Sequence, residues 1–225
     1  MHYFATAISA HWAFLDYVLL AAVAHYRGKL GEAVQWARRG LEAEPQSYLS
    51  GQLSGCLFWT LAAQGDPEAG SALTAARAYL PVAGRILTIG SSSCLSLVIE
   101  GLAVAGRRQE AAALQSEAEW VVATGPLCLY TRHLFRTSAG IAAACARNWA
   151  RAEEHHQAAI DIADSTGCRV ARPVVRYWYA DMLCSRDMAG DRARAREFLS
   201  EALSLYDAMG MVWHAGCTAK RLSNL

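Results

Sequence analysis

The sequence lacks the short patterns that would identify an enzyme or a metal site. Its seven cysteines are too widely separated to form a CxxC pair, which argues against a zinc knuckle or a dithiol redox site. It contains no HExxH, GxSxG or GxxxxGK[ST] motif, so a metalloprotease helix, a nucleophile elbow and a phosphate-binding loop are not expected. We therefore expect no enzymatic activity, no cofactor and no metal.

A strong charge excess and long apolar runs are also missing. Lysine and arginine total 21 against 20 acidic residues, a net charge of +1, so the electrostatic footprint of nucleic-acid binding is absent. Residues 1–20 carry no basic segment and include Asp16, unlike a signal peptide. The longest uncharged run, 45–65, contains three glutamines, too polar for a membrane span. We expect a soluble, cytoplasmic protein that binds neither nucleic acid nor membrane.

What the sequence does contain is abundant alanine and evenly spaced helix breakers. Glycine or proline recurs between stretches of about 15 to 20 residues, close to ordinary helix lengths, and no convincing strand alternation is present. Asp66 before Pro67 has the pattern of an N-cap followed by proline at the first helical position. The pattern predicts an all-α fold of about eleven helices.

A pair of small residues seven positions apart recurs along the chain. Seven residues make nearly two helical turns, so both members share one face and allow a neighbouring helix to approach closely. We call these the anchor positions: Ala33 and Gly40, Ala69 and Ala76 in a degenerate copy, Ala111 and Ala118, Ala152 and Ala159, and Ala195 and Ala202. Since each anchored helix follows another helix and a short turn, the repeating unit is a helical hairpin, and stacked hairpins form a solenoid.

The expected organisation is a single domain spanning 1–225. It consists of about five antiparallel helix pairs and a terminal helix over 211–223. The pairs are expected at 5–45, 46–81, 85–124, 127–166 and 170–208.

The first and last repeats resemble known helical repeats. The first resembles the tetratricopeptide pattern, although smaller residues stand at some large positions, through Tyr17, Leu20, Ala21, Ala24, Gly28, Ala33, Gly40 and Pro45. The segment 202–214, ALSLYDAMGMVWH, is similar to the C-terminal repeats of large bacterial signalling proteins. In those proteins an adenylate/guanylate cyclase or a DNA-binding regulator carries an AAA-type ATPase module followed by degenerate tetratricopeptide repeats. The resemblance implies a right-handed α-solenoid.

The same resemblance implies a non-catalytic scaffold for protein–protein interaction or intramolecular signal relay. The chain would be the C-terminal part of a larger bacterial ATPase or cyclase, or a paralogue of it, and the catalytic activity is not carried over. The alternative is a small-ligand sensor domain of a transcriptional regulator. An all-α enzyme is least favoured because no acid, base and nucleophile constellation emerges.

Our candidate partner-binding surface is a group of arginines and tyrosines that precede or lie in the first helices of the last two hairpins. The first helices of tetratricopeptide solenoids line the concave face, and Tyr and Arg dominate binding hot spots. The candidates are Tyr130, Arg132, Arg136, Arg172, Arg176 and Tyr179. The alternative is ordinary arginines paired with Glu153, Asp161 or Asp164. A chaperone-type carboxylate clamp of Lys and Asn is not expected, because lysine and asparagine each occur only twice.

Two further segments have competing interpretations. Glu153–Glu154–His155–His156 could bind a metal, but adjacent histidines point about 100° apart on a helix. We therefore expect partly buried histidines beside solvated glutamates. Ser91, Ser92 and Ser93 are interpreted as a serine-capped helix start rather than a nucleophile.

The first helix, expected over residues 5–26, is apolar on several sides. Terminal repeats usually carry a polar cap. We therefore expect this helix to pack on an upstream domain of the same polypeptide or to form a homodimer.

Overall fold

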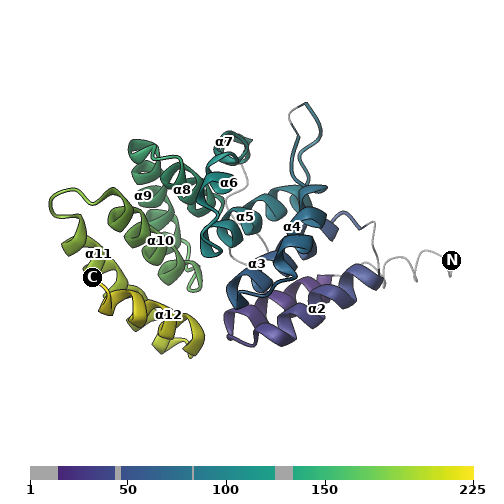
Figure 1. The fold of residues 1–225 in the computed structure, drawn as a ribbon, viewed down its shortest axis with the longest axis horizontal. Helices are drawn as coiled ribbons and strands as arrows, with labels where there is room; N and C mark the ends of the chain where they lie inside the picture. Colours follow the sequence, from purple (N-terminus) through teal and green to yellow (C-terminus); the bar gives the residue numbers. More distant parts are fainter. Residues whose placement is uncertain (1–14, 44–46, 83, 125–133) are drawn as a thin grey trace. The chain divides into compact units, whose positions relative to one another are not determined.

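The computed structural model describes residues 15–43, 47–82, 84–124 and 134–225 (Figure 1). They form twelve α-helices, and no β-strand occurs within these ranges, so the all-α prediction is confirmed. The first helix is described over residues 15–26. The others are α2 Leu30–Ala43, α3 Ser50–Gln64, α4 Ala69–Arg77, α5 Ile89–Val104, α6 Arg108–Ala112, α7 Gln115–Thr124, α8 Phe135–Cys145, α9 Trp149–Ser165, α10 Ala171–Arg186, α11 Asp191–Ala208 and α12 Val212–Ser223.

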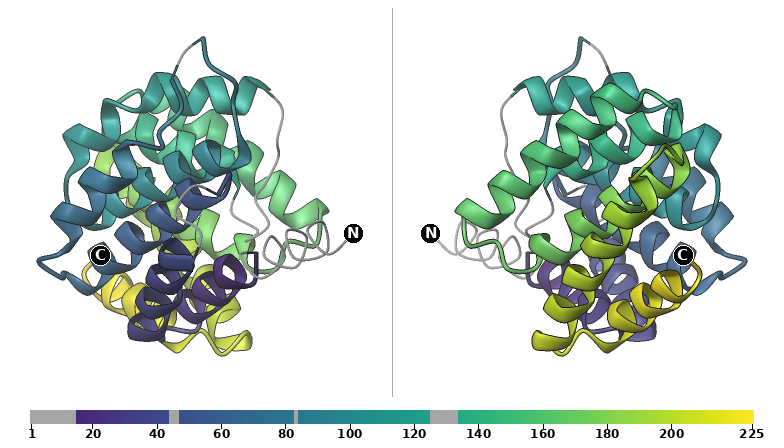
Figure 2. Two further views of the ribbon diagram at one scale, coloured as in Figure 1. Left: turned by 90° about the vertical axis from the view of Figure 1, so that its right-hand side faces the viewer. Right: turned by 90° about the vertical axis from the view of Figure 1, so that its left-hand side faces the viewer.

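The chain divides into two compact units, each described here by itself. The N-terminal unit runs to Ala105 without Tyr26–Gly28, and the C-terminal unit comprises Tyr26–Gly28 and Gly106–Leu225. Helices pack mainly on their neighbours in the chain: α3 packs on α2, α4 and α5, and α10 lies between α9 and α11. Figure 2 shows the helices of the C-terminal unit following one another as pairs. Such sequential pairing is consistent with a helical-repeat arrangement.

Turn chemistry explains where helices begin and end. The Thr88 hydroxyl oxygen accepts a hydrogen bond from the Ser91 backbone N–H, and the Ser91 hydroxyl oxygen accepts one from the Thr88 backbone N–H. These two reciprocal bonds form a capping box at the start of α5. The helix start predicted at the serine run is therefore present, but its cap is Thr88 and not a serine. α3 ends at Gly65, whose φ of 66° favours glycine. The second helix of the third predicted pair is broken at Ala113, which separates α6 from α7.

The anchor positions are buried with one exception. Ala33, Ala76, Ala111, Ala118, Ala152, Ala159, Ala195 and Ala202 are at most 3% exposed, and Gly40 is buried as well. A Cβ on Gly40 would lie 2.5 Å from Leu53 Cδ1 of α3, so the small residue is needed for that contact. Ala69 is only half-buried, and Ala72 and Leu73 pack beside Ala76 instead. The degenerate copy was therefore assigned correctly at one of its two positions.

The core of the N-terminal unit is the crossing of α3 and α5. Both helices are buried along nearly their whole length. Glycines bring the backbones together: a Cβ on Gly51 would lie 2.8 Å from the Gly90 carbonyl oxygen, and one on Gly55 would lie 3.0 Å from Cys94 Cα. Close approach of this kind lets apolar side chains interdigitate at crystal-like density.

None of the helices within the described ranges combines the length and the apolar character that a membrane span requires.

Candidate partner-binding surface

The sequence-predicted surface is only partly described. Tyr130 and Arg132 lie outside the described residues. Arg136 is in the first turn of α8, where its Nη1 lies 3.4 Å from Nδ1 of the buried His155 on α9. Arg136 therefore contacts the second helix of its own hairpin.

Arg172 and Arg176, at the start of α10, fasten this helix to its neighbours. Arg176 donates to the Asp164 carboxylate of α9 at 2.9 and 3.2 Å and to Glu201 of α11 at 2.7 Å. Only 12% of its side chain is exposed. Burial opposes its charge, but the hydrogen bonds to both carboxylates outweigh burial and raise the Arg176 pKa. Arg172 donates to the Asp164 carbonyl oxygen at 2.9 Å. The pairing with Asp164 that the sequence left open as the alternative is therefore formed.

Tyr179 is a core residue of the C-terminal unit. It is 1% exposed, and its ring stacks on His156 and on Phe198, with centroids 5.5 and 4.7 Å away. Its hydroxyl donates to Glu153 Oε1 at 2.9 Å and accepts from Arg194 Nη2 at 2.9 Å. Because so little of Tyr179 is exposed to solvent, it lies beneath the candidate partner-binding surface and has almost no area that could contact a partner.

Glu153 is not simply solvated, which corrects the sequence-based interpretation. Its carboxylate joins three helices, because it accepts from Arg186 Nη1 at 2.6 Å, from Arg194 Nη1 at 3.2 Å and from Tyr179. Although burial opposes ionisation, these hydrogen bonds lower the Glu153 pKa. Arg186 also binds Asp191 with two nitrogens, at 2.8 and 2.7 Å. The result is an ion network that ties α9 to α10 and α11.

His155 and His156 are buried more deeply than expected, at 1% and 0% exposure. The His156 ring fills the space above Gly140 of α8, where a Cβ would lie 2.7 Å from its Cε1. Neither ring nitrogen of His156 has a hydrogen-bond partner in the part of the chain that the structure describes, and burial lowers the His156 pKa to about 3. No group of three His, Cys, Asp or Glu within the described ranges is placed to hold a metal ion. Both histidines pack in the interior of the C-terminal unit.

A charged cluster that the sequence analysis missed lies on α6, α10 and α12. Asp181 of α10 is 5% exposed, and it accepts from Arg108 Nη2 of α6 at 3.0 Å and pairs with Arg221 Nη2 of α12 at 2.5 Å. Arg108 also donates to the Ser185 hydroxyl at 3.1 Å. Arg108 and Arg221 keep 37% and 32% of their side chains exposed. We call these three residues the Arg108–Asp181–Arg221 cluster.

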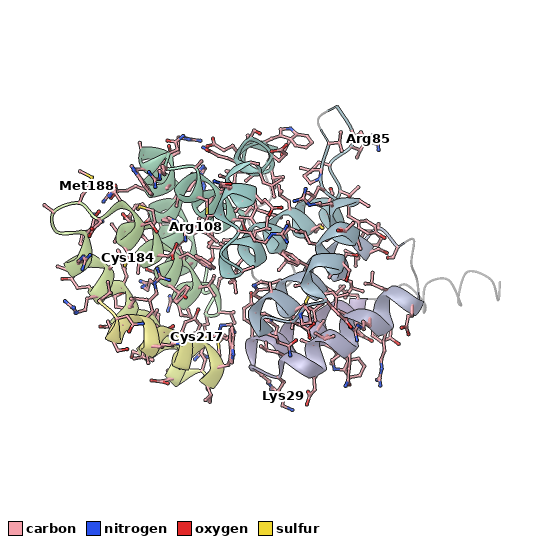
Figure 3. The ribbon with its side chains drawn as sticks, in the orientation of Figure 1. Lys29, Arg85, Arg108, Cys184, Met188 and Cys217 are labelled. Carbon is pink, nitrogen blue, oxygen red and sulfur yellow. The ribbon has the colours of Figure 1, made fainter. Side chains whose placement is uncertain are left out.

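Neutral side chains surround the Arg108–Asp181–Arg221 cluster. The Arg221 guanidinium lies 5.7 Å from the ring centroid of Tyr177, within cation–π range. Burial raises the pKa of the Cys145 thiol to about 11 and also raises the pKa values of Cys184 and Cys217. Figure 3 labels Arg108, Cys184 and Cys217 on α6, α10 and α12. These side chains are therefore neutral at neutral pH, although Lys220 acts on the Cys217 thiol and Arg192 on the Cys184 thiol.

One sequence signal could have pointed to this cluster. Asp181 is a lone carboxylate between Ala180 and Met182 in an otherwise apolar stretch of α10, and a buried charge requires a partner. The identity of its partners could not be predicted, because Arg108 is 73 residues away in the chain.

No protein-family model, no curated protein and no solved structure matches the chain. The helix pairs and the side-chain contacts described above are therefore the basis for a functional conclusion.

Proposed function

We propose that the chain is a non-catalytic helical-repeat scaffold that binds a protein or peptide partner, or an upstream domain of the same polypeptide. The observation that carries this proposal is the Arg108–Asp181–Arg221 cluster, in which side chains from three helices of the C-terminal unit, α6, α10 and α12, meet at one partly exposed surface. Repeat proteins bind extended partners with surfaces assembled in this way from several repeats.

The proposal includes a tetratricopeptide-like, right-handed α-solenoid formed by a single domain over 1–225. The buried anchor positions support it, because the same two places in successive hairpins are held by small side chains in close contact. The resemblance of 202–214 to the C-terminal repeats of bacterial signalling proteins supports a place in, or descent from, a larger ATPase or cyclase.

Arg136 stays in the proposed partner surface, together with Tyr130 and Arg132. Arg172, Arg176 and Tyr179 belong to it as supporting residues, since their side chains are committed to Asp164, Glu201 and Glu153.

A homodimer through the first helix is a second element of the proposal. Leu19, Leu20 and Val23 are 38%, 41% and 47% exposed, and they lie within a single turn or so of this helix. Light scattering should show a dimer for the wild type and a monomer for Leu20→Glu. A monomeric wild type across the micromolar range would contradict this element.

Chemical cross-linking with mass spectrometry tests the scaffold proposal. The full chain is incubated in a lysate of its source organism, and the heat-denatured chain serves as the matched control. We expect a protein that cross-links only to the folded chain, with cross-linked positions on the solvent side of α8, α10 or α12. Native mass spectra that show a bound small molecule and no protein would overturn the proposal in favour of a ligand sensor.

A further inference from the structure

We propose that the Arg108–Asp181–Arg221 cluster binds a carboxylate side chain of the partner, an Asp or Glu with an apolar neighbour. This inference rests on the proposed scaffold function and names the chemistry that the partner presents.

The first argument is charge balance. Two guanidinium groups converge on one carboxylate, which leaves an excess of one positive charge. Arg221 is close enough to disfavour the charge of Arg108, and Asp181 is the carboxylate that acts on both arginines. A second carboxylate would remove this repulsion, because opposite charges within about 4 to 6 Å stabilise one another.

The second argument is unused hydrogen-bonding capacity. A guanidinium carries five N–H donors in a planar fork that suits a carboxylate. Arg108 reaches both Asp181 and Ser185 through Nη2, and Arg221 reaches Asp181 through Nη2 as well. Arg221 also interacts by side-chain hydrogen bonding with Tyr177 and Cys184. Both arginines nevertheless keep part of their side chains exposed, 37% for Arg108 and 32% for Arg221, so an incoming acceptor can reach them.

The third argument is the surrounding rim. Tyr177, Cys184 and Cys217 are half-buried and neutral, so they suit an apolar side chain beside the carboxylate. Charged pairs gain strength where neighbouring apolar contacts exclude water.

Titration of the full chain with two short peptides, followed by NMR, tests the inference. The probes are N-acetyl-Leu-Glu-Leu-amide and its matched Gln counterpart, which differ only in the charge. We expect the glutamyl peptide to bind about tenfold more tightly, the ratio typical of a charge-assisted hydrogen bond. Arg108→Gln and Arg221→Gln should each remove that advantage. Arg196→Gln, an equal charge change at an exposed position of α11, should leave it intact.

Asp181→Asn separates binding from a purely structural role. It removes the internal carboxylate that competes for both arginines, so the glutamyl peptide should bind several-fold more tightly to it than to the wild type. It also keeps the test valid if both arginine variants fail to fold. The inference is wrong if Asp181→Asn binds the glutamyl peptide more weakly than the wild type does. It is also wrong if neither Asp181→Asn nor the arginine variants fold and the wild type does not prefer the glutamyl peptide.

Other outcomes would overturn the inference without touching the scaffold function. Equal binding of the two peptides, or competition by inorganic phosphate at lower concentration than the glutamyl peptide, rules out a carboxylate site. If Arg108→Gln and Arg221→Gln still cross-link to the partner at full yield, the scaffold function is retained, but the Arg108–Asp181–Arg221 cluster is not the site that contacts the partner. Absence of any partner, with intact peptide selectivity, would instead count against the scaffold.

Discussion

The two units build similar helix pairs by different means. In the N-terminal unit, α3 and α5 cross through glycines, and Gly51, Gly55 and Gly90 each face backbone or Cβ atoms of a neighbouring segment. In the C-terminal unit, ion pairs link different helices, as Arg151 of α9 does with Glu119 of α7. The N-terminal unit is therefore held mainly by close backbone approach, and the C-terminal unit adds specific charged contacts to its alanine seams.

This difference has a functional consequence. Contacts made by close backbone packing are buried and fixed, whereas charged contacts that are partly exposed can exchange partners. The Arg108–Asp181–Arg221 cluster is such a contact. Mutations that change volume should therefore affect the N-terminal unit most, and changes of charge or pH the C-terminal unit.

The largest expected effect is that of Gly90→Ala. A Cβ at this position would collide with the Tyr48 carbonyl oxygen, which cannot rotate away as a side chain could. We expect a loss of about 3 kcal/mol or more in the free energy of unfolding, at the upper end for overpacked cores. Urea denaturation measures it. Gly70→Ala in α4, where a Cβ would meet nothing within 4 Å, should instead stabilise the chain by about 0.5 to 1 kcal/mol; equal losses in both variants would contradict the comparison.

Arg186→Met should produce the next largest effect. It leaves the carboxylate of Asp191, which is 2% exposed, without the guanidinium that binds it twice. Removing one partner of a buried pair costs about 3 kcal/mol, again measured by urea denaturation. Arg38→Met is the matched control in the N-terminal unit, because Arg38 and Glu68 form an exposed pair that should contribute within about 0.5 kcal/mol. Similar losses for the two variants would show that the units do not differ in this respect.

Mild acid should destabilise the C-terminal unit through His156. Its pKa falls from 6.5 to about 3 in the folded chain because burial disfavours the imidazolium; Asp181 opposes this shift and His155 adds to it. The unfolded chain therefore takes up a proton near pH 6.5, whereas the folded chain does not until about pH 3, so stability falls as the pH falls through this window. Between pH 7 and pH 5 the expected loss is about 2 kcal/mol.

Urea denaturation at both pH values checks this loss, with His156→Leu as the control. The variant should keep only the smaller acid sensitivity that arises from His155, whose pKa burial also lowers. Glu119 does not contribute between pH 7 and pH 5. Its pKa is lowered to about 2, chiefly by the hydrogen bond from Arg151, so the stability that it contributes is lost only at more acidic pH. An unchanged acid response in His156→Leu would refute the assignment.

The smallest expected effect compares two helix caps. Thr88→Ala removes the capping box of α5 in the N-terminal unit and should cost about 1 kcal/mol. Asn148→Ala removes the cap of α9 in the C-terminal unit, where the hydrogen bond from the Arg151 N–H is long, at 3.5 Å, and should cost about half as much. Thermal unfolding followed by circular dichroism measures both. A larger loss for Asn148→Ala would reverse this comparison.

Much of the local structure could be predicted, because it depends on residues close in the chain. The break at Gly65, the helix start before Ser91 and the burial of Ala152 and Ala159 all follow from turn chemistry and helical spacing. The interruption between α6 and α7 could not be predicted, since neither glycine nor proline marks it.

The contacts of the candidate site residues were less predictable. The sequence left two interpretations open for Arg172 and Arg176, and the structure shows that both bind Asp164. Tyr179, also a candidate, is buried. The sequence did not identify Arg108 and Arg221 as candidates, because a single arginine near a helix end has the same sequence pattern whether its side chain forms an ion pair or is open to a partner.

The sequence by itself determined an all-α chain, the positions of most of its helices, and the small residues through which paired helices touch. These depend on short-range properties: glycine and proline interrupt helices, and a spacing of seven returns to the same face. The tertiary structure alone decided which charges meet. Asp181 finds Arg108 and Arg221 only once α6, α10 and α12 are packed, because electrostatic attraction depends on distance in space and on burial.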